Sequence, residues 1–203
     1  MIKNVVFDMG GVLIDFNPDL FLLREGILDT AERERLRNII FTRAEWCFLD
    51  WGDKSEDEYL SEYVLPNLDK KYHLLANKLV KHWDEPIVPI AGMAEVVRWC
   101  HEKGLYIYLL SNASSRLHEY FSRIPSSEYF LGKVVSGDIH LVKPQREIYQ
   151  YLLKKFSLSA EETIFIDDNM LNVASAMRQG IHAFLFRGDV KALSVYLEKE
   201  IEK

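Results

Sequence analysis

The sequence predicts a doubly wound α/β fold, in which helices cover both faces of a parallel sheet, with a helical subdomain inserted after the first strand. Short apolar, β-rich runs that alternate with helical patterns predict the sheet and its helices. The insertion is predicted because residues 16–88 contain helical patterns and no convincing strand. We therefore expect a core domain at residues 1–15 and 89–203 and a helical subdomain at 16–88.

Five runs are predicted to be strands because they are apolar on both faces, as in a sheet buried between helices. They are "NVVF" (4–7), "LYIYLL" (105–110), "KVVS" (133–136), "TIFI" (163–166) and "HAFLF" (182–186). Three helices are expected between them, at 89–103, 144–156 and 170–179. Prolines suited to a first helical turn begin the first two, and a glycine follows the first and the third.

The inserted stretch has its own helical patterns, at 30–41, 55–65 and 70–83. It is too long for a simple crossover between two parallel strands, so we expect it to pack as a small subdomain. Its linkers to the core are expected near Asp15–Pro18 and Asp84–Pro89.

Composition limits the possible partners. The chain has 203 residues, 48% of them apolar, and a net charge of −6, which argues against nucleic acid or an anionic membrane as the main partner. Cys47 and Cys100 are far apart, so we expect neither a disulfide framework nor a zinc site. The first residues lack the layout of a signal peptide. We expect a cytoplasmic monomer or weak homodimer that acts on a small molecule.

Polar side chains follow four of the predicted strands or precede a helix. They are Asp8, Ser111, Asn112, Lys143, Asp167 and Asp168. Each taken alone has a structural interpretation, as a helix cap, a turn former or a helix entry. Open parallel sheets, however, place their sites beyond the carboxyl ends of the strands. Together, in this order, the six residues favour one site.

With these residues the chain resembles the haloacid dehalogenase-like hydrolases. Their four motifs are present in order as "DMGGV", "SN", "K" before proline, and "DD". The chain is most similar to the subgroup that opens "FDLGNV" or "FDMGGV", which includes bacterial phosphatases active on glucose 1-phosphate. The resemblance implies a Rossmann-like core, an all-helical cap at residues 16–88, Mg²⁺, and hydrolysis of phosphate monoesters, such as sugar phosphates, through an aspartyl-phosphate.

The resemblance also implies the metal site. Asp8 would be the nucleophile, and its carboxylate would bind Mg²⁺ together with the main-chain carbonyl of Gly10 and the carboxylate of Asp168. Asp167 would lie beside the ion or act through water. Oxygen ligands of this kind suit Mg²⁺, which retains several waters.

The remaining motifs would hold the phosphate. By the resemblance, Ser111 and Asn112 would bind phosphoryl oxygens. Lys143 would be catalytic and substrate-binding, because a compact ammonium can neutralise charge between Asp8 and the phosphate.

Gly10 departs from the family pattern. Most phosphatases of the family carry an acid-base aspartate two residues after the nucleophile, and here that residue is Gly10. Asp15 is a candidate replacement, although an aspartate at that place commonly belongs to the hinge with the cap. A missing acid favours an anomeric phosphate or another good leaving group, with water or a cap residue moving the proton.

Two alternatives to a phosphatase stay open. A haloacid dehalogenase would also lack the second aspartate, but its fourth motif typically replaces the metal-binding acid, which "IDDN" retains. A non-catalytic binding or regulatory module would keep the fold alone. Within the cap, the polar and aromatic segment 42–53 is expected to face the pocket, with Arg43, Glu45 and Trp46 as candidates for substrate specificity.

Overall fold

The computed structural model contains one five-stranded sheet with strand order β3-β2-β1-β4-β5, in which every neighbouring pair is parallel. The strands are β1 (Asn4–Phe7), β2 (Tyr106–Ser111), β3 (Phe130–Val135), β4 (Thr163–Asp167) and β5 (His182–Leu185). The predicted Rossmann-like, doubly wound core with inserted helices is confirmed. The structure describes residues 1–202, so the last residue of the predicted core segment 89–203 lies outside it.

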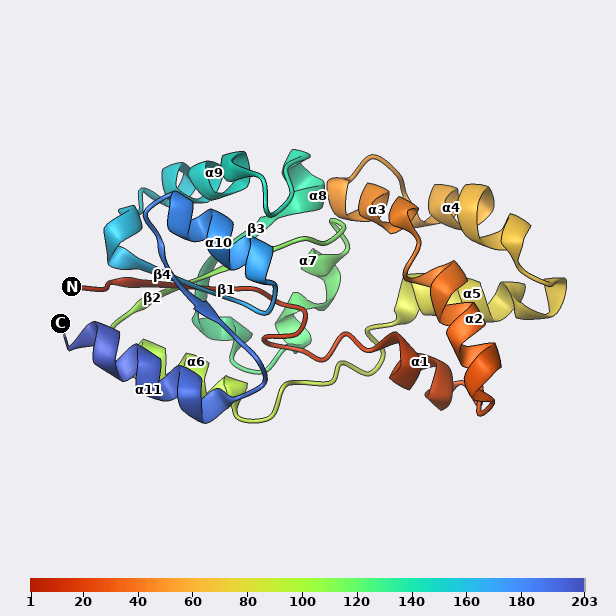
Figure 1. Ribbon diagram of the computed structural model, residues 1–203, viewed down its shortest axis with the longest axis horizontal. Helices are drawn as coiled ribbons and strands as arrows, with labels where there is room; N and C mark the ends of the chain where they lie inside the picture. Colours follow the sequence, from red (N-terminus) through yellow and green to blue (C-terminus); the bar gives the residue numbers. More distant parts are fainter. Residues whose placement is uncertain (203) are drawn as a thin grey trace.

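Helices cover both faces of the sheet (Figure 1). On one face, α6 (Met93–Glu102) and α11 (Val190–Ile201) pack on strand residues such as Val5 and Phe7. On the other face, α9 (Arg146–Phe156) and α10 (Met170–Arg178) pack with residues such as Val6. Successive β1 residues therefore enter opposite layers, which explains why the sequence of the strand is apolar throughout.

Two helices begin later than the sequence predicts. The first starts at Met93 because Pro89 forms an antiparallel bridge with Ile14 and belongs to a linker. The second starts at Arg146 because the main-chain N–H of Gln145 donates to the carbonyl of Val142 and closes a turn. In both cases the proline lies before the helix, so the expectation of a proline in the first turn is wrong.

The third strand also differs from its prediction. It spans Phe130–Val135, whereas the run 133–136 was expected. Phe130 extends the strand because its ring packs 5.9 Å from that of Phe7 and 5.4 Å from that of Phe121, between ring centroids. The strand ends before Ser136, which begins the short helix α8 (Ser136–Ile139).

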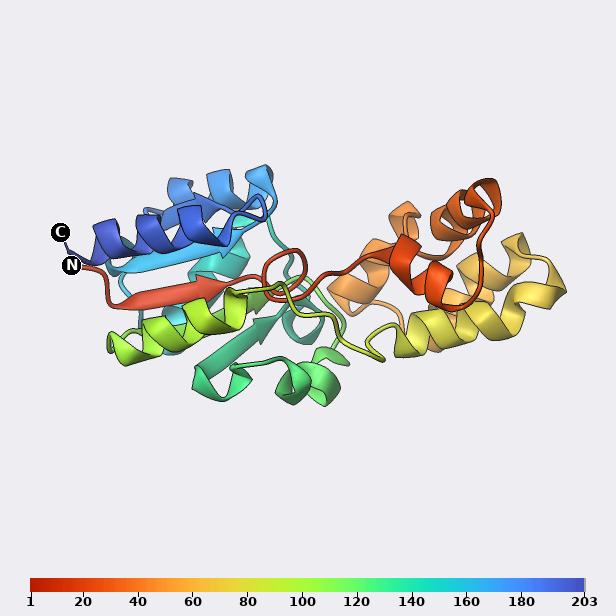
Figure 2. The same ribbon diagram turned by 90° about the horizontal axis from the view of Figure 1, so that it is seen from below.

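The insertion between β1 and β2 is helical throughout its regular elements (Figure 2). Its α-helices are α1 (Pro18–Arg24), α2 (Thr30–Ile40), α3 (Cys47–Trp51), α4 (Glu56–Tyr59) and α5 (His73–His82). The expected helix 55–65 is interrupted, because α4 continues as a π-turn at Leu60–Val64 and a 3₁₀ turn that contains Pro66. The expected helix 70–83 begins as a 3₁₀ turn at Lys70–Tyr72.

This insertion has its own hydrophobic cluster, separate from the two clusters of the sheet. Tyr59 lies fully buried in it and donates its hydroxyl to the carbonyl of Ile40 at 3.0 Å. Figures 1 and 2 show the insertion as a second body joined to the sheet by two chain segments. These segments pair, since Asp15 N–H donates to Val88 O at 2.8 Å and Ile90 N–H to Leu13 O at 3.0 Å. Among the helices of residues 1–202, none is long and apolar enough to cross a bilayer.

A buried charge network joins the linker, the sheet domain and the insertion. Asp84, with a side chain 1% exposed, accepts hydrogen bonds from Arg116 and Arg123. Arg116 also donates to Glu56 of α4 at 2.7 Å. Removing one partner of such a network leaves the others buried with uncompensated charge.

We expect Asp84→Ala to lower the free energy of unfolding by about 3–5 kcal/mol, because Arg116 loses a buried partner. Urea denaturation followed by circular dichroism measures the change. Asp57→Ala is the matched control, since the Asp57 side chain is 78% exposed in its pair with Lys81 and exposed pairs contribute little. Equal effects of the two substitutions would contradict the structural role of the network.

Candidate active site

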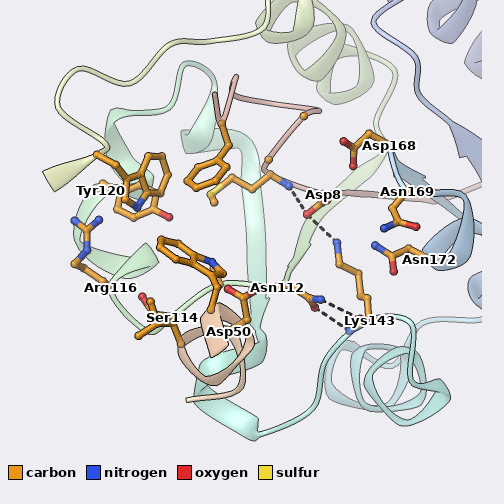
Figure 3. Close-up of a pocket in the computed structure, with 18 of the residues that line it drawn as sticks. Asp8, Asp50, Asn112, Ser114, Arg116, Tyr120, Lys143, Asp168, Asn169 and Asn172 are labelled. Carbon is orange, nitrogen blue, oxygen red and sulfur yellow. Dashed lines mark hydrogen bonds and ion pairs between the residues drawn. The ribbon is translucent and has the colours of Figure 1, made fainter. Parts of the chain in front are cut away.

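A cavity of about 470 Å³ lies at the carboxyl ends of β1, β2 and β4 and is closed on the other side by the helical insertion (Figure 3). The sheet domain contributes polar groups, which include Asp8, Asn112, Lys143 and Asp168. The insertion and its linkers contribute mostly apolar side chains, among them Phe16, Trp46, Leu49, Val80 and Trp83, and the carboxyl groups of Asp50 and Glu56. The structure therefore brings the ends of separate strands to one place, as the sequence predicts.

Lys143 is the central cation of this cavity. Its Nζ lies 2.8 Å from Oδ1 of Asp8, 2.7 Å from Oδ2 of Asp167 and 3.0 Å from the carbonyl of Leu110. All three N–H groups of the ammonium are therefore used, and the side chain is buried. This fixes the Nζ next to the Asp8 carboxylate.

Asp167 holds Lys143 in place and does not line the cavity. Besides Lys143, its carboxylate accepts hydrogen bonds from Nδ2 of Asn172 at 3.1 Å to both oxygens and from the main-chain N–H of Asn169 at 2.8 Å. The side chain is fully buried. Its oxygens are thus committed to protein donors, whereas the neighbouring Asp168 faces the cavity.

The two glycines after Asp8 differ in what they allow. Gly11 has φ +71°, and a Cβ there would lie 2.2 Å from Oδ2 of Asp168, so the position requires glycine. Gly10 has no positive φ, and a Cβ there would meet only Cβ of Phe16, at 3.8 Å. The sequence pattern "GG" does not distinguish these two roles.

The acidic residues could hold a divalent cation. Carboxylate oxygens of Asp8, Asp167 and Asp168 lie within 4.8 Å of one another. Burial raises the pKa of Asp8 to about 7, against the opposing effect of Lys143. Burial and the charge of Asp167 also raise the pKa of Asp168. Three carboxylates face one ammonium, so the excess negative charge and the all-oxygen donor set fit Mg²⁺.

The two residues of the second motif are placed differently. Asn112 lines the cavity, and its side chain accepts from the main-chain N–H of Lys143 at 2.8 Å and donates to the carbonyl of Lys143 at 2.9 Å. Ser111 is buried and is not one of the cavity-lining residues, and its hydroxyl has no hydrogen-bond partner within residues 1–202. Ser114, which the sequence analysis missed, lines the cavity.

Of the three cap candidates, only Trp46 lines the cavity. Arg43 and Glu45 do not, because the guanidinium of Arg43 donates to both carboxylate oxygens of Glu45, at 3.1 and 3.2 Å. Asp15 is also absent from the lining, and its main chain pairs with Val88 in the linkers, which agrees with a hinge position.

Four further lining residues were not predicted as site residues from the sequence, namely Asp50, Glu56, Arg116 and Tyr120. None belongs to a motif. Asp50 and Glu56 belong to the short helices α3 and α4 of the insertion, and Arg116 and Tyr120 lie at the two ends of the short helix α7 (Leu117–Tyr120) of the sheet domain. Asp50 could have been considered from the sequence, because it is a polar residue within segment 42–53, which was expected to face the pocket.

A family model described as haloacid dehalogenase-like hydrolase matches residues 2–180. The chain belongs to this family. Among curated relatives of this hydrolase, a sesquiterpene phosphatase of Aspergillus oryzae is 26% identical over 183 residues, which cover 88% of this chain and 87% of the relative. A D-ribitol-5-phosphate phosphatase of Bacteroides thetaiotaomicron is 25% identical over 195 residues, with 91% of each chain covered. These names agree with the prediction of a phosphatase.

Solved structures share the fold of this hydrolase. A HAD family enzyme from Bacteroides thetaiotaomicron, in complex with magnesium and inorganic phosphate, superposes with a TM-score of 0.68 at 20% identity, covering 93% of this chain and 96% of the other. A dehalogenase superposes with a TM-score of 0.71 at 16% identity, covering 90% and 83%. At such identities the similarity establishes the fold, which hosts both chemistries.

Proposed function

We propose that this protein is a Mg²⁺-dependent hydrolase of small phosphorylated metabolites that forms an aspartyl-phosphate on Asp8. The observation that carries the proposal is the contact between Asp8 and Lys143 at the mouth of the sheet, beside Asp168. The phosphatase names of the relatives support it, as does the magnesium and phosphate complex of the HAD family enzyme. Residues 1–15 and 89–203 would form the catalytic core, and residues 16–88 the cap.

The residues present divide the chemistry between them. The Asp8 carboxylate would attack phosphorus, the bond to the leaving oxygen would break, and water would then hydrolyse the phosphorylated Asp8. Lys143 would reduce the repulsion between Asp8 and the anionic phosphate, because its charge lies 2.8 Å from the attacking carboxylate. Bound by Asp8, Asp168 and the carbonyl of Gly10, Mg²⁺ would supply further positive charge against the phosphoryl oxygens.

The second motif would support the phosphate site in two ways. Asn112 lies on the wall of the cavity and would hold the main chain of Lys143 in position. The second N–H of the Asn112 side-chain amide would donate to a phosphoryl oxygen. The unpartnered hydroxyl of Ser111 next to it would donate to the phosphate if the main chain adjusts on binding. Buried polar groups without a partner are costly, which favours such a ligand.

We propose sugar phosphates as the substrates, with anomeric phosphates the most reactive. The cavity volume of about 470 Å³ suits a small metabolite. Its lining includes Trp46, Trp83 and Tyr120, and aromatic rings can pack on the apolar face of a sugar. An anomeric oxygen needs less protonation than a primary alkoxide, so an anomeric phosphate reacts more readily whichever group supplies the proton in place of Gly10.

A metal-free haloacid dehalogenase is less well supported, because Asp168 and its neighbours gather more negative charge than one lysine balances. A non-catalytic module is less well supported because Asp8, Lys143 and Asp168 are kept together with an open cavity.

A phosphate-release assay tests the proposal. We expect the protein to release phosphate from glucose 1-phosphate and p-nitrophenyl phosphate, and more slowly from glucose 6-phosphate. After treatment with a chelator we expect no phosphate release from any of the three esters. Phosphate release from a prenyl monophosphate tests whether an apolar leaving group is accepted. Halide release from 2-chloropropionate tests for dehalogenation. Halide release without metal, in the absence of phosphate release, would overturn the proposed function.

A further inference from the structure

The cap segment that contains Asp50 is fixed on the sheet domain by contacts with α8. Ser136 donates its hydroxyl to the carbonyl of Asp50, and Nε1 of Trp51 donates to the carbonyl of His140 at 3.1 Å. Gly52 follows with φ +75°, and a Cβ on Gly52 would lie 2.3 Å from the carbonyl oxygen of Gly137. The main chains of cap and core are thus in direct contact here, which only glycine permits.

The same α8 residues hold the loop after β2. The main-chain N–H of Ala113 donates to the hydroxyl of Ser136 at 2.9 Å, and the N–H of Gly137 donates to the carbonyl of Ala113 at 3.0 Å. Ala113 lines the cavity beside Asn112. One hydroxyl, that of Ser136, therefore links the main chain of Asp50 to a loop of the active site.

The side chain of Asp50 lines the cavity together with Asp8, Asn112 and Lys143 (Figure 3). Four carboxyl groups line this cavity. Asp8 and Asp168 belong to the acidic cluster, and Glu56 is paired with Arg116 at 2.7 Å. Within residues 1–202 no hydrogen bond or ion pair engages the carboxyl group of Asp50. It is thus the one lining carboxyl in that range that belongs neither to the acidic cluster nor to an ion pair.

The environment of Asp50 suits proton transfer at neutral pH. Burial raises the pKa of its carboxyl group to about 7, and the charge of Lys143 opposes this only in part. Both protonation states are therefore populated near neutrality, as an acid-base group requires. Asp50 and the reacting Asp8 line the same cavity.

We propose that Asp50 is the general acid and base of the reaction, supplied by the cap in place of the side chain that Gly10 lacks. This inference rests on the proposed function. In the first step Asp8 attacks phosphorus, the bond between phosphorus and the leaving oxygen breaks, and protonated Asp50 gives its proton to that oxygen. In the second step the Asp50 carboxylate takes a proton from water, whose oxygen attacks phosphorus. The bond to Asp8 breaks, and inorganic phosphate and protonated Asp50 result.

The test compares kcat/KM of Asp50→Asn for two esters. For glucose 6-phosphate, whose alkoxide leaving group needs a proton, we expect a loss of about 10²- to 10⁴-fold. For p-nitrophenyl phosphate, whose leaving group is stable as an anion, we expect a much smaller loss in kcat/KM. A burst of nitrophenolate should appear before the steady state, because the hydrolysis of phosphorylated Asp8 is slowed. Equal losses for the two esters, or no loss, would overturn the assignment.

Asp53→Asn is the matched control. Asp53 lies in the same segment, 3.4 Å from the ring of His140 of the core, and outside the cavity lining. We expect this substitution to leave kcat/KM unchanged for both esters. If the wild-type protein releases phosphate and Asp8→Asn does not, while Asp50→Asn is fully active on glucose 6-phosphate, the proposed function stands and the role of Asp50 is wrong.

Rescue supplies an independent readout. Gly10 has no positive φ and has room for a side chain, so Gly10→Asp can place a carboxyl group on the core side of the cavity. In the double variant, kcat/KM for glucose 6-phosphate should be at least about tenfold higher than in Asp50→Asn alone, a gain within the range of general acid catalysis. The value for p-nitrophenyl phosphate should rise little. An equal gain on both esters would overturn a proton-transfer role for Asp50.

Discussion

Asp8→Asn should abolish phosphate release from every ester while the protein stays folded. The amide matches the carboxylate in shape, so it can still accept hydrogen bonds from Lys143 and from the main-chain N–H of Met9, which lies 2.7 Å from Oδ1 of Asp8. It lacks the negative charge that attacks phosphorus. Steady-state assays with glucose 1-phosphate and p-nitrophenyl phosphate measure the loss, which should exceed about 10²-fold.

The fold of this variant is checked by thermal unfolding. Lys143 keeps Asp167 as its counter-charge at 2.7 Å, so its ammonium is not left unpaired. Asp19→Asn is a suitable comparison, because Asp19 pairs with Arg37 in the cap, away from the cavity lining. A folded Asp8→Asn protein with more than about a hundredth of the wild-type rate would rule out Asp8 as the nucleophile.

Chelation of divalent cations should stop hydrolysis, and added Mg²⁺ should restore it. Asp168 is exposed to the cavity, so Asp168→Ala should fold normally and yet need far more Mg²⁺ or lose activity. The physical reason is that Asp8, Asp167 and Asp168 crowd their negative charges around one ammonium. Without added positive charge, an anionic substrate would meet further repulsion.

A readout that does not depend on turnover is the stability of the free protein. Mg²⁺ that binds the folded state should raise Tm as its concentration rises, and the shift should shrink in Asp168→Ala. Asp189→Ala, which removes the N-cap of α11 far along the chain, should lower Tm but keep the Mg²⁺-dependent shift. Full activity in chelator would contradict the metal requirement and favour a dehalogenase-type reaction.

The residues that the sequence located are those whose positions follow from the sheet. Asp8 directly follows β1, and Asp168 follows β4. Since parallel strands present their carboxyl ends at one edge, adjacency in space could be inferred from strand prediction alone. Lys143 was located by its place before Pro144, and the structure adds the reason for its position, which is the pair of buried carboxylates around its Nζ.

The residues that escaped prediction depend on contacts between distant parts of the chain. Asp50 reaches the cavity because Gly52 packs against Gly137, a contact that no local pattern encodes. Arg43 and Glu45 were favoured for their polar character, but they satisfy each other instead. Local sequence could not show that, because a charged side chain in a loop has many possible partners.

The open space at Gly10 has an evolutionary consequence. Every glycine codon is a single nucleotide change from a codon for Asp or Glu, and the backbone at this position accepts a side chain without strain. At Gly11, where φ is positive and Asp168 occupies the same space, such a substitution would force the loop or Asp168 to move. A lineage can therefore gain or lose an acid beside the nucleophile in one mutational step and leave the loop intact. The site of proton transfer can in this way migrate between core and cap while the nucleophile stays fixed.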